Sequence, residues 1–134
     1  MKILHLPLKA KWYEMIENGT KTEEYREIKP YWVKRLLKVI DVHHNHYEDV
    51  DNECAHFYTE NVDLLKEDFK MGGFQQKGYA HVKFFYGYTR RTMTYEIESI
   101  TIGKGKREWG APEENVFIIK LGKRLDNSEL LTEK

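Results

Sequence analysis

Charged residues of opposite sign crowd into one short segment that follows Gly19. In an extended strand, Glu24 and Arg26 share one face, because side chains alternate with a period of two. A buried charge persists only when it is paired and hydrogen-bonded. We therefore expect Glu24 and Arg26 to hold each other at the lining of a cleft, with guanidinium donors left for a phosphate or a base edge. Lys21, just past the turn at Gly19, can point into the same cleft. The alternative is a solvated edge strand.

A second basic segment, from Gly103 to Pro112, is rich in glycine. Glycines 103 and 105 permit positive φ, so backbone amides could converge there on an anion. The spacing matches neither a Walker loop nor a dinucleotide fingerprint. Trp109 could stack on a base or plug the end of a barrel. The positive charges of this segment belong to Lys104, Lys106 and Arg107.

Tyr88, Arg90 and Arg91 form a basic turn between two predicted strands. Such a turn would extend a nucleic-acid-binding surface. The alternative interpretation is a plain solvated hairpin.

A histidine-rich and acidic stretch raises the question of a metal, because imidazole and carboxylate together suit zinc and other transition metals. Its spacing matches no closed site and it lacks a paired cysteine, so we expect a flexible acidic loop without a metal. The residues concerned are His43, His44, His46, Glu48, Asp49, Asp51, Glu53, Cys54 and His56.

Length and composition bound the possible classes of protein. A chain of 134 residues with 40% apolar residues fits one domain. Lys plus Arg and Asp plus Glu number 22 each, so nucleic-acid binding would have to come from local clusters. The single cysteine favours a reducing compartment, and no segment is apolar enough to span a membrane. We expect a cytoplasmic protein with no membrane partner, and the sequence leaves its oligomeric state open.

Hydrophobic periodicity predicts the elements that must position these residues. The parity of the inward face changes near Ser99, which predicts a bulge in a strand there. Several short strands with a few short helices indicate an α+β fold, a small mixed barrel with helices at its openings. The predicted elements are a strand Lys2–Leu6 stopped by Pro7, a helix Ala10–Asn18, an alternating segment Lys21–Ile28 with charge on both faces that hydrophobic patterning alone does not place in a sheet, a helix from Pro30 to Ile40, a helix Thr59–Lys70 ending near Gly72 and Gly73, and strands within 79–86, 93–102 and 115–121, before a polar tail, Asp126–Lys134.

Residues Gly19 to Arg26 spell G-x-K-x-x-E-x-R between a helix and a strand. This motif resembles the signature of the ASCH domain, a relative of the PUA domain, and the stretch from Ile102 to Leu121 is similar to the closing part of small bacterial and phage ASCH proteins. The resemblance implies a small PUA-like mixed β-barrel with short flanking helices. On this basis residues 1–125 form a single domain with an inserted helical segment at about 43–78.

The resemblance also implies a cleft for RNA or a modified nucleotide, without an obligatory cofactor. A binding module is our preferred hypothesis, and an enzyme would be a hydrolase. The residues expected to bind nucleic acid are Lys21, Arg26, Arg90, Arg91, Lys104, Lys106, Arg107 and Trp109.

Two alternatives to a binding module stay open. Some proteins similar to this family hydrolyse an acyl amide on a modified cytidine with a lysine, a threonine and a glutamate. The resemblance places the lysine on Lys21 and the glutamate on Glu96 or Glu98, but Glu24 stands at the position of the threonine nucleophile, which a carboxylate replaces poorly. Lys21 with Glu24 could instead act as a base on RNA or an amide. The other alternative is a protein-interaction domain that uses the helix Thr59–Lys70.

The charge of Lys21 separates these roles. Burial lowers a lysine pKa, whereas a neighbouring carboxylate raises it. We expect the Glu24 carboxylate to prevail, so that Lys21 stays protonated and acts electrostatically rather than as a base.

Overall fold

The computed structural model describes residues 2–125, which form two β-sheets and four α-helices. The predicted tail 126–134 lies outside the described residues. In chain order the elements are β1 (Ile3–Leu8), α1 (Ala10–Glu17), β2 (Glu23–Glu27), α2 (Pro30–Leu36), β3 (Leu37–Asp41), β4 (His46–Asp49), α3 (Asn52–Glu60), α4 (Val62–Lys70), β5 (Phe74–Gln76), β6 (His81–Tyr86), β7 (Thr92–Lys104), a 3₁₀ turn (Arg107–Trp109) and β8 (Asn115–Leu125).

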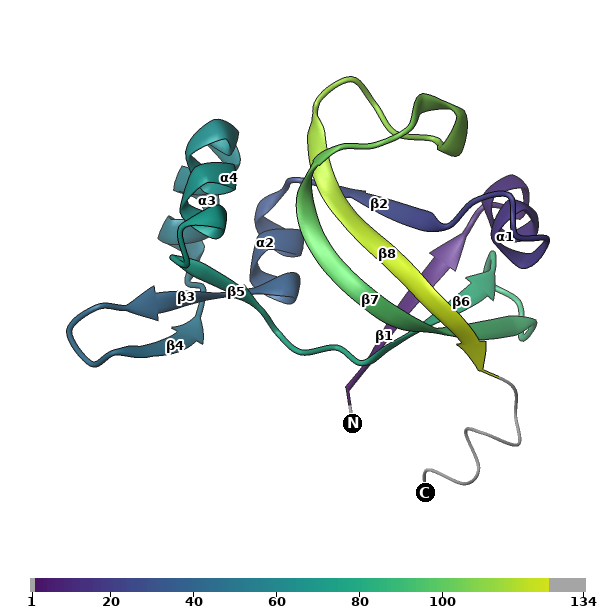
Figure 1. The fold of residues 1–134 in the computed structure, drawn as a ribbon, viewed down its shortest axis with the longest axis horizontal. Coiled ribbons are helices and arrows are strands. Elements are labelled where there is room, and N and C mark those ends of the chain that lie inside the picture. Colours follow the sequence, from purple (N-terminus) through teal and green to yellow (C-terminus); the bar gives the residue numbers. More distant parts are fainter. Residues whose placement is uncertain (1, 126–134) are drawn as a thin grey trace.

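The larger sheet has the strand order β1-β6-β7-β8-β2 and curls into a half-barrel (Figure 1). Only β1 and β6 pair in parallel; the other neighbours are antiparallel. The register of β7 against β8 shifts between Tyr95 and Ser99, which confirms the bulge predicted near Ser99. The mixed α+β class is also confirmed. Among the described strands, no backbone ladder joins β1 to β2, so the curled sheet stays open between them.

The core fills the inside of the curl. On β1, Leu4, Leu6 and Leu8 are buried and alternate with exposed residues. This strand runs through Pro7, so the predicted stop at Pro7 is wrong. Because β1 is an edge strand, the missing N–H of Pro7 does not interrupt the sheet interior. The predicted helix at 10–18 is confirmed as α1, which packs Tyr13 and Ile16 into the core.

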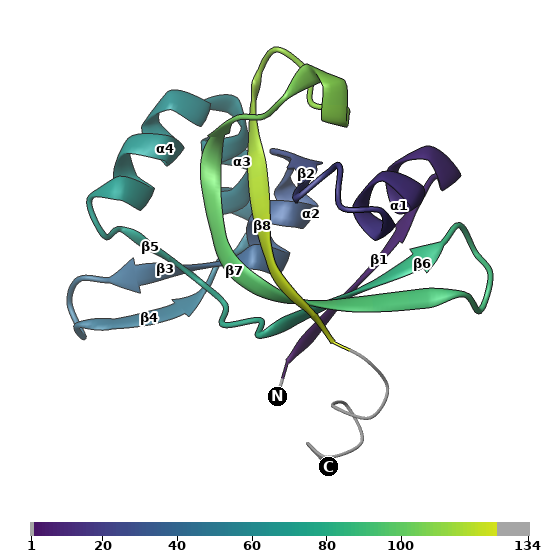
Figure 2. The same ribbon diagram turned by 45° about the vertical axis from the view of Figure 1, so that its right-hand side comes forward.

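The smaller sheet has the order β4-β3-β5 and lies with α2, α3 and α4 on one side of the half-barrel, whereas α1 lies at the other end (Figures 1 and 2). The sequence predicts that the helix begun at Pro30 continues to Ile40, which is wrong beyond Leu36. Val39 instead pairs with Phe74 of β5, and Ile40 pairs with Tyr47 of β4. Val and Ile are β-branched and fit a pleated surface better than a helix.

The histidine-rich stretch is ordered rather than a flexible loop. Its first two histidines lie in the turn between β3 and β4, and the rest forms β4 and the start of α3, where the side chain of Asp51 caps the helix by accepting from the N–H of Cys54 at 2.8 Å. The helix predicted at 59–70 is interrupted at Asn61, which separates α3 from α4. The predicted helix end near Gly72 is confirmed.

One hydrophobic cluster connects the two sheets. It joins Leu65 of α4 and Phe74 of β5 to Leu4 and Phe84 of the half-barrel. The segment predicted as an insertion thus shares a core with the rest of the chain. Within residues 2–125, every α-helix has nine residues or fewer, and none is long and apolar enough to cross a membrane.

Candidate functional site

The turn after α1 carries Lys21 to the open side of the half-barrel. Gly19 closes the helix with a φ of 86°, a conformation that glycine adopts without strain. The amide of Lys21 then donates to the carbonyl oxygen of Met15 at 2.9 Å, which folds the chain back toward α1. β2 follows and pairs with β8 along one side only, so its other side faces the opening.

Lys21 is almost completely buried, with 2% of the residue exposed. Its Nζ lies 2.9 Å from Oε1 of Glu24 and donates to the carbonyl oxygen of Trp109. The amine also lies 4.6 Å from the ring centroid of Trp12 and 5.2 Å from that of Tyr25. Aromatic faces attract cations, so these two rings favour the ammonium form.

Burial lowers the pKa of Lys21, and the attraction of the Glu24 carboxylate, which raises it, only partly compensates. The expectation that the carboxylate would prevail over burial is therefore wrong. The reason is that Lys21 is almost completely buried, so desolvation of the ammonium is the larger effect. That Lys21 is still protonated at neutral pH stays a prediction.

Glu24, with 4% of the residue exposed, joins two cations. Its second carboxylate oxygen accepts from Nη1 of Arg26, which also donates to the carbonyl oxygen of Tyr25 at 2.8 Å. Nη2 of Arg26 lies 3.4 Å from the carbonyl oxygen of Pro7 in β1. The predicted convergence of Lys21, Glu24 and Arg26 is confirmed, and with all three ionised this network carries one net positive charge.

A cavity of about 330 Å³ opens over the network. This volume lies at the lower end of the range for small-molecule sites. A second cavity of about 420 Å³ shares Tyr25, Arg26 and Gly110 with it and extends toward Trp32. The walls of the first cavity include the side chains of Lys9, Trp12, Lys21, Glu24, Tyr25, Arg26 and Trp109.

The loop from Gly105 to Pro112 forms a roof over these cavities because two glycines let it pack closely. A Cβ on Gly105 would lie 2.6 Å from that of Ala111 and 2.7 Å from the Tyr25 ring. Gly110 has a φ of 96°, and a Cβ there would lie 2.8 Å from Trp12. The hydroxyl of Tyr25 accepts from the N–H of Lys106 at 3.0 Å, which ties the roof to β2.

The expected cradle of backbone amides at glycines 103 and 105 is wrong, because neither residue has a positive φ. Gly103 is part of β7 and pairs with Val116, and Gly105 packs on Tyr25. These glycines serve close packing of the chain rather than an anion.

The basic residues predicted for this segment line neither of the two cavities, and of its predicted residues only Trp109 lines one. Lys104 donates to the carbonyl oxygen of Glu113, and the exposed Arg107 lies 3.4 Å from the carboxylate of the same residue. Nζ of Lys106 lies 4.2 Å from the Trp109 ring centroid. Trp109 is half-buried and packs on the small cluster around Tyr25.

The turn with Arg90 and Arg91 lies between β6 and β7, and neither arginine lines the two cavities over β2. Arg91 pairs with Glu17 of α1 at 2.8 Å, and its guanidinium lies over the ring of Tyr86. The glutamates of the hydrolase alternative also lie elsewhere. Glu96 and Glu98 are exposed on β7, and Glu98 lies 3.4 Å from Lys120.

The sequence analysis did not place Trp12, Tyr25 and Trp32 in the site. The sequence held a signal for two of them, because Trp12 is on the helix before Lys21 and Tyr25 lies between Glu24 and Arg26. Strand alternation places Tyr25 on the face opposite Glu24 and Arg26, and it reaches the cavities because the roof wraps around that face.

Comparison with known proteins adds nothing to this picture: no family model, no curated protein and no solved structure matches the chain.

Proposed function

We propose that this protein is an ASCH-like, PUA-related domain that binds RNA or a modified nucleotide through the cavity over β2. The proposal depends above all on the buried network of Lys21, Glu24 and Arg26 in a cavity that also has aromatic walls. The single free cysteine, Cys54, supports a location in the reducing cytoplasm.

The chemistry of the cavity suits a nucleotide. Lys9, Lys21 and Arg26 outnumber the one carboxylate, Glu24, so a phosphate would meet a net positive charge. Among the described residues, Arg26 donates three hydrogen bonds, two from Nη1 and one from Nη2. A guanidinium carries five N–H groups, so donors are left for a phosphate. Trp12 and Trp109 offer π-faces on which a base can stack, which typically contributes about 1–3 kcal/mol per base.

The binding function predicts a modest salt dependence. With two or three basic residues on phosphates, the logarithm of the affinity for single-stranded RNA should fall with the logarithm of salt concentration with a slope of about −2. Tryptophan fluorescence of the full chain, titrated with nucleoside monophosphates and with single-stranded and structured RNA at two salt concentrations, measures it. Absent or salt-independent binding of every RNA would contradict the proposal and favour a small-ligand or protein-interaction role.

A hydrolase that acts on an acylated nucleoside or on RNA is the second candidate. The observation in its favour is the lowered pKa of the buried Lys21, because a general base needs a neutral amine. Against it, the nucleophilic hydroxyl of the similar enzymes has no counterpart at Glu24, and the exposed Glu96 and Glu98 do not line the cavity.

Lys21 is expected to be an ammonium at neutral pH despite its lowered pKa, because it donates to both Glu24 and the Trp109 carbonyl group. A pH titration of the lysine ¹³Cε resonances in the unmodified protein measures this directly. A neutral Lys21 amine at pH 7 would contradict the electrostatic role.

The Lys21→Arg variant tests the same point, because arginine keeps the charge but cannot act as a base. Its melting temperature reports whether the larger side chain is accommodated. Nucleotide binding retained by the variant would agree with a binding module. Acetylcytidine or RNA hydrolysis by the parent that vanishes in the variant, with binding intact, would establish the enzyme instead.

A further inference from the structure

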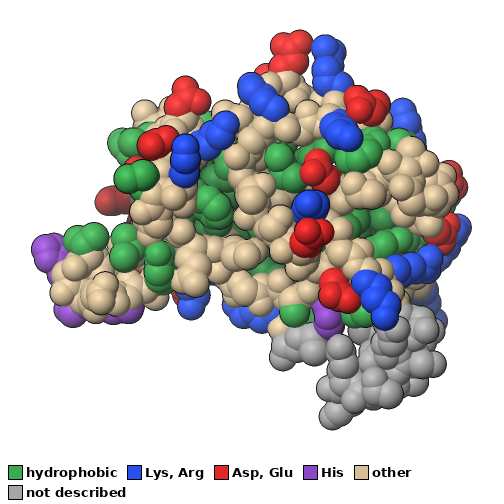
Figure 3. All heavy atoms as spheres, in the orientation of Figure 1, with side chains coloured by type: hydrophobic (Ala, Val, Ile, Leu, Met, Phe, Trp, Pro, Cys, Tyr) green, Lys and Arg blue, Asp and Glu red, His purple; other side chains and the backbone are tan. Residues whose placement is uncertain are grey.

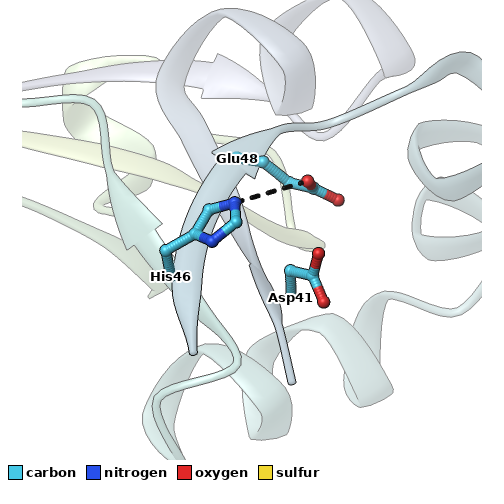
Figure 4. A group of neighbouring side chains, drawn as sticks. All are labelled: Asp41, His46 and Glu48. Atoms are coloured by element: carbon cyan, nitrogen blue, oxygen red, sulfur yellow. Dashed lines mark ion pairs between the residues drawn. The ribbon is translucent and has the colours of Figure 1, made fainter. Parts of the chain in front are cut away.

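The β3–β4 hairpin gathers metal-ligating side chains at its free end, far from the cavity over β2 (Figure 1). Asp41 and His46 are directly opposed across the two strands, and Glu48 follows two residues later on the same face of β4. One ligand atom from each of these three side chains lies within 4.8 Å of the other two. Figure 4 shows the imidazole and both carboxylates turned toward a common space.

Asp41 is already held in place at this end of the hairpin. Its Oδ1 accepts from the backbone N–H groups of His43 at 3.0 Å and His44 at 3.3 Å, and its Oδ2 lies 2.7 Å from Nδ1 of His44. Together these bonds fix the orientation of the Asp41 carboxylate at the end of the hairpin.

The side chains of His46 and Glu48 are exposed, which leaves them room to close around an ion. Their side chains are 55% and 52% exposed, and Nε2 of His46 lies 3.8 Å from a carboxylate oxygen of Glu48. Ligand atoms at about 2.1 Å from a tetrahedral zinc ion are about 3.4 Å apart, so small rotations of exposed side chains suffice. Figure 3 shows histidines gathered at this end of the molecule.

We propose that the end of the β3–β4 hairpin is a binding site for a divalent first-row transition cation such as Zn²⁺, held by Asp41, His46 and Glu48 with water completing the coordination. An imidazole beside two carboxylates favours these metals over Mg²⁺ and Ca²⁺, which take oxygen ligands. His44 is the outer partner that orients Asp41.

Isothermal titration of the untagged full chain with ZnCl₂ and NiCl₂ tests the site, with MgCl₂ and CaCl₂ for comparison. We expect one Zn²⁺ per chain and at least about tenfold weaker binding in His46→Ala and in Glu48→Gln. His43→Ala is the matched control, because this exposed neighbour contacts Asp41 through its backbone alone, and its affinity should equal that of the parent.

Three outcomes of the calorimetric titrations would overturn the proposal. They are no Zn²⁺ binding by the parent, unchanged affinity in His46→Ala, and loss of binding in Cys54→Ser, which would identify a thiol site instead. A Co²⁺ titration followed by NMR needs no variant and should broaden the amide signals of residues 41–48 first. Broadening elsewhere first would also contradict it. The Arg26→Ala variant should bind Zn²⁺ like the parent, which keeps this test separate from the nucleotide proposal.

Discussion

Replacing Glu24 by glutamine should lower the melting temperature by roughly 10–20 °C, the largest effect we expect from any single change at the site. The substitution removes the one carboxylate that forms ion pairs with both Lys21 and Arg26. Breaking a buried ion pair from one side costs about 3–5 kcal/mol, because an uncompensated charge stays in a dry environment. In a domain of this size each kcal/mol shifts the melting temperature by about 4 °C. Thermal unfolding followed by circular dichroism measures the change.

Glu27→Gln is the matched control, on the same strand and with the same loss of charge. Glu27 pairs with Lys29, and both side chains are more than 60% exposed. Exposed pairs contribute at most about 1 kcal/mol, so the melting temperature should change by about 4 °C or less. Equal effects of the two substitutions would show that the Glu24 network is solvated and would remove the basis of the site.

Replacing Arg26 by alanine should weaken nucleotide binding by roughly 100-fold, because truncating one partner of a buried charged contact costs about 2–5 kcal/mol. The loss of stability should be smaller than that of Glu24→Gln. The reason is that Lys21 also forms an ion pair with the Glu24 carboxylate and stays after the substitution. Binding curves and thermal unfolding on the same preparations separate the two effects.

Arg107→Ala tests whether the loss is specific to the cavity. The Arg107 side chain is 77% exposed on the roof and does not line either cavity over β2. Its removal should reduce affinity no more than the loss of one distant charge does. If Arg107→Ala weakened binding as much as Arg26→Ala, the nucleic acid would follow the outer face of the roof and not the cavity.

Local signals in the sequence were sufficient to predict the first half of the site. The helical spacing before Gly19 and the need to pair Glu24 with Arg26 both act within a few residues, and the structure has α1, β2 and the ion pair as predicted. The same method failed at Leu37, where apolar residues at helical spacing continue into β3. Pairing with Phe74 and Tyr47, both distant in sequence, decides that segment.

The aromatic walls could not be predicted because they depend on contacts between remote segments. Tyr25 and Lys106 are bonded across 81 residues, and Lys21 and Trp109 across 88. The composition of the roof suggested an anion cradle, since glycine signals positive φ and close packing equally well. Only the distances from Gly105 to Tyr25 and from Gly110 to Trp12 show that close packing is the reason here.

Because the half-barrel is open between β1 and β2, Arg26 also has a structural role. β1 and β2 are the two edges of one curled sheet, and the guanidinium of Arg26 in β2 reaches across to the carbonyl oxygen of Pro7 in β1. A side chain thus bridges the seam where a closed barrel would have a row of backbone bonds. The cavity is lined by residues of both β1 and β2, so a bound ligand would contact both edge strands and link them a second time. Ligand binding would then stabilise the sheet against local opening. Amides of β1 and β2 that do not contact the ligand should therefore also gain protection from hydrogen exchange.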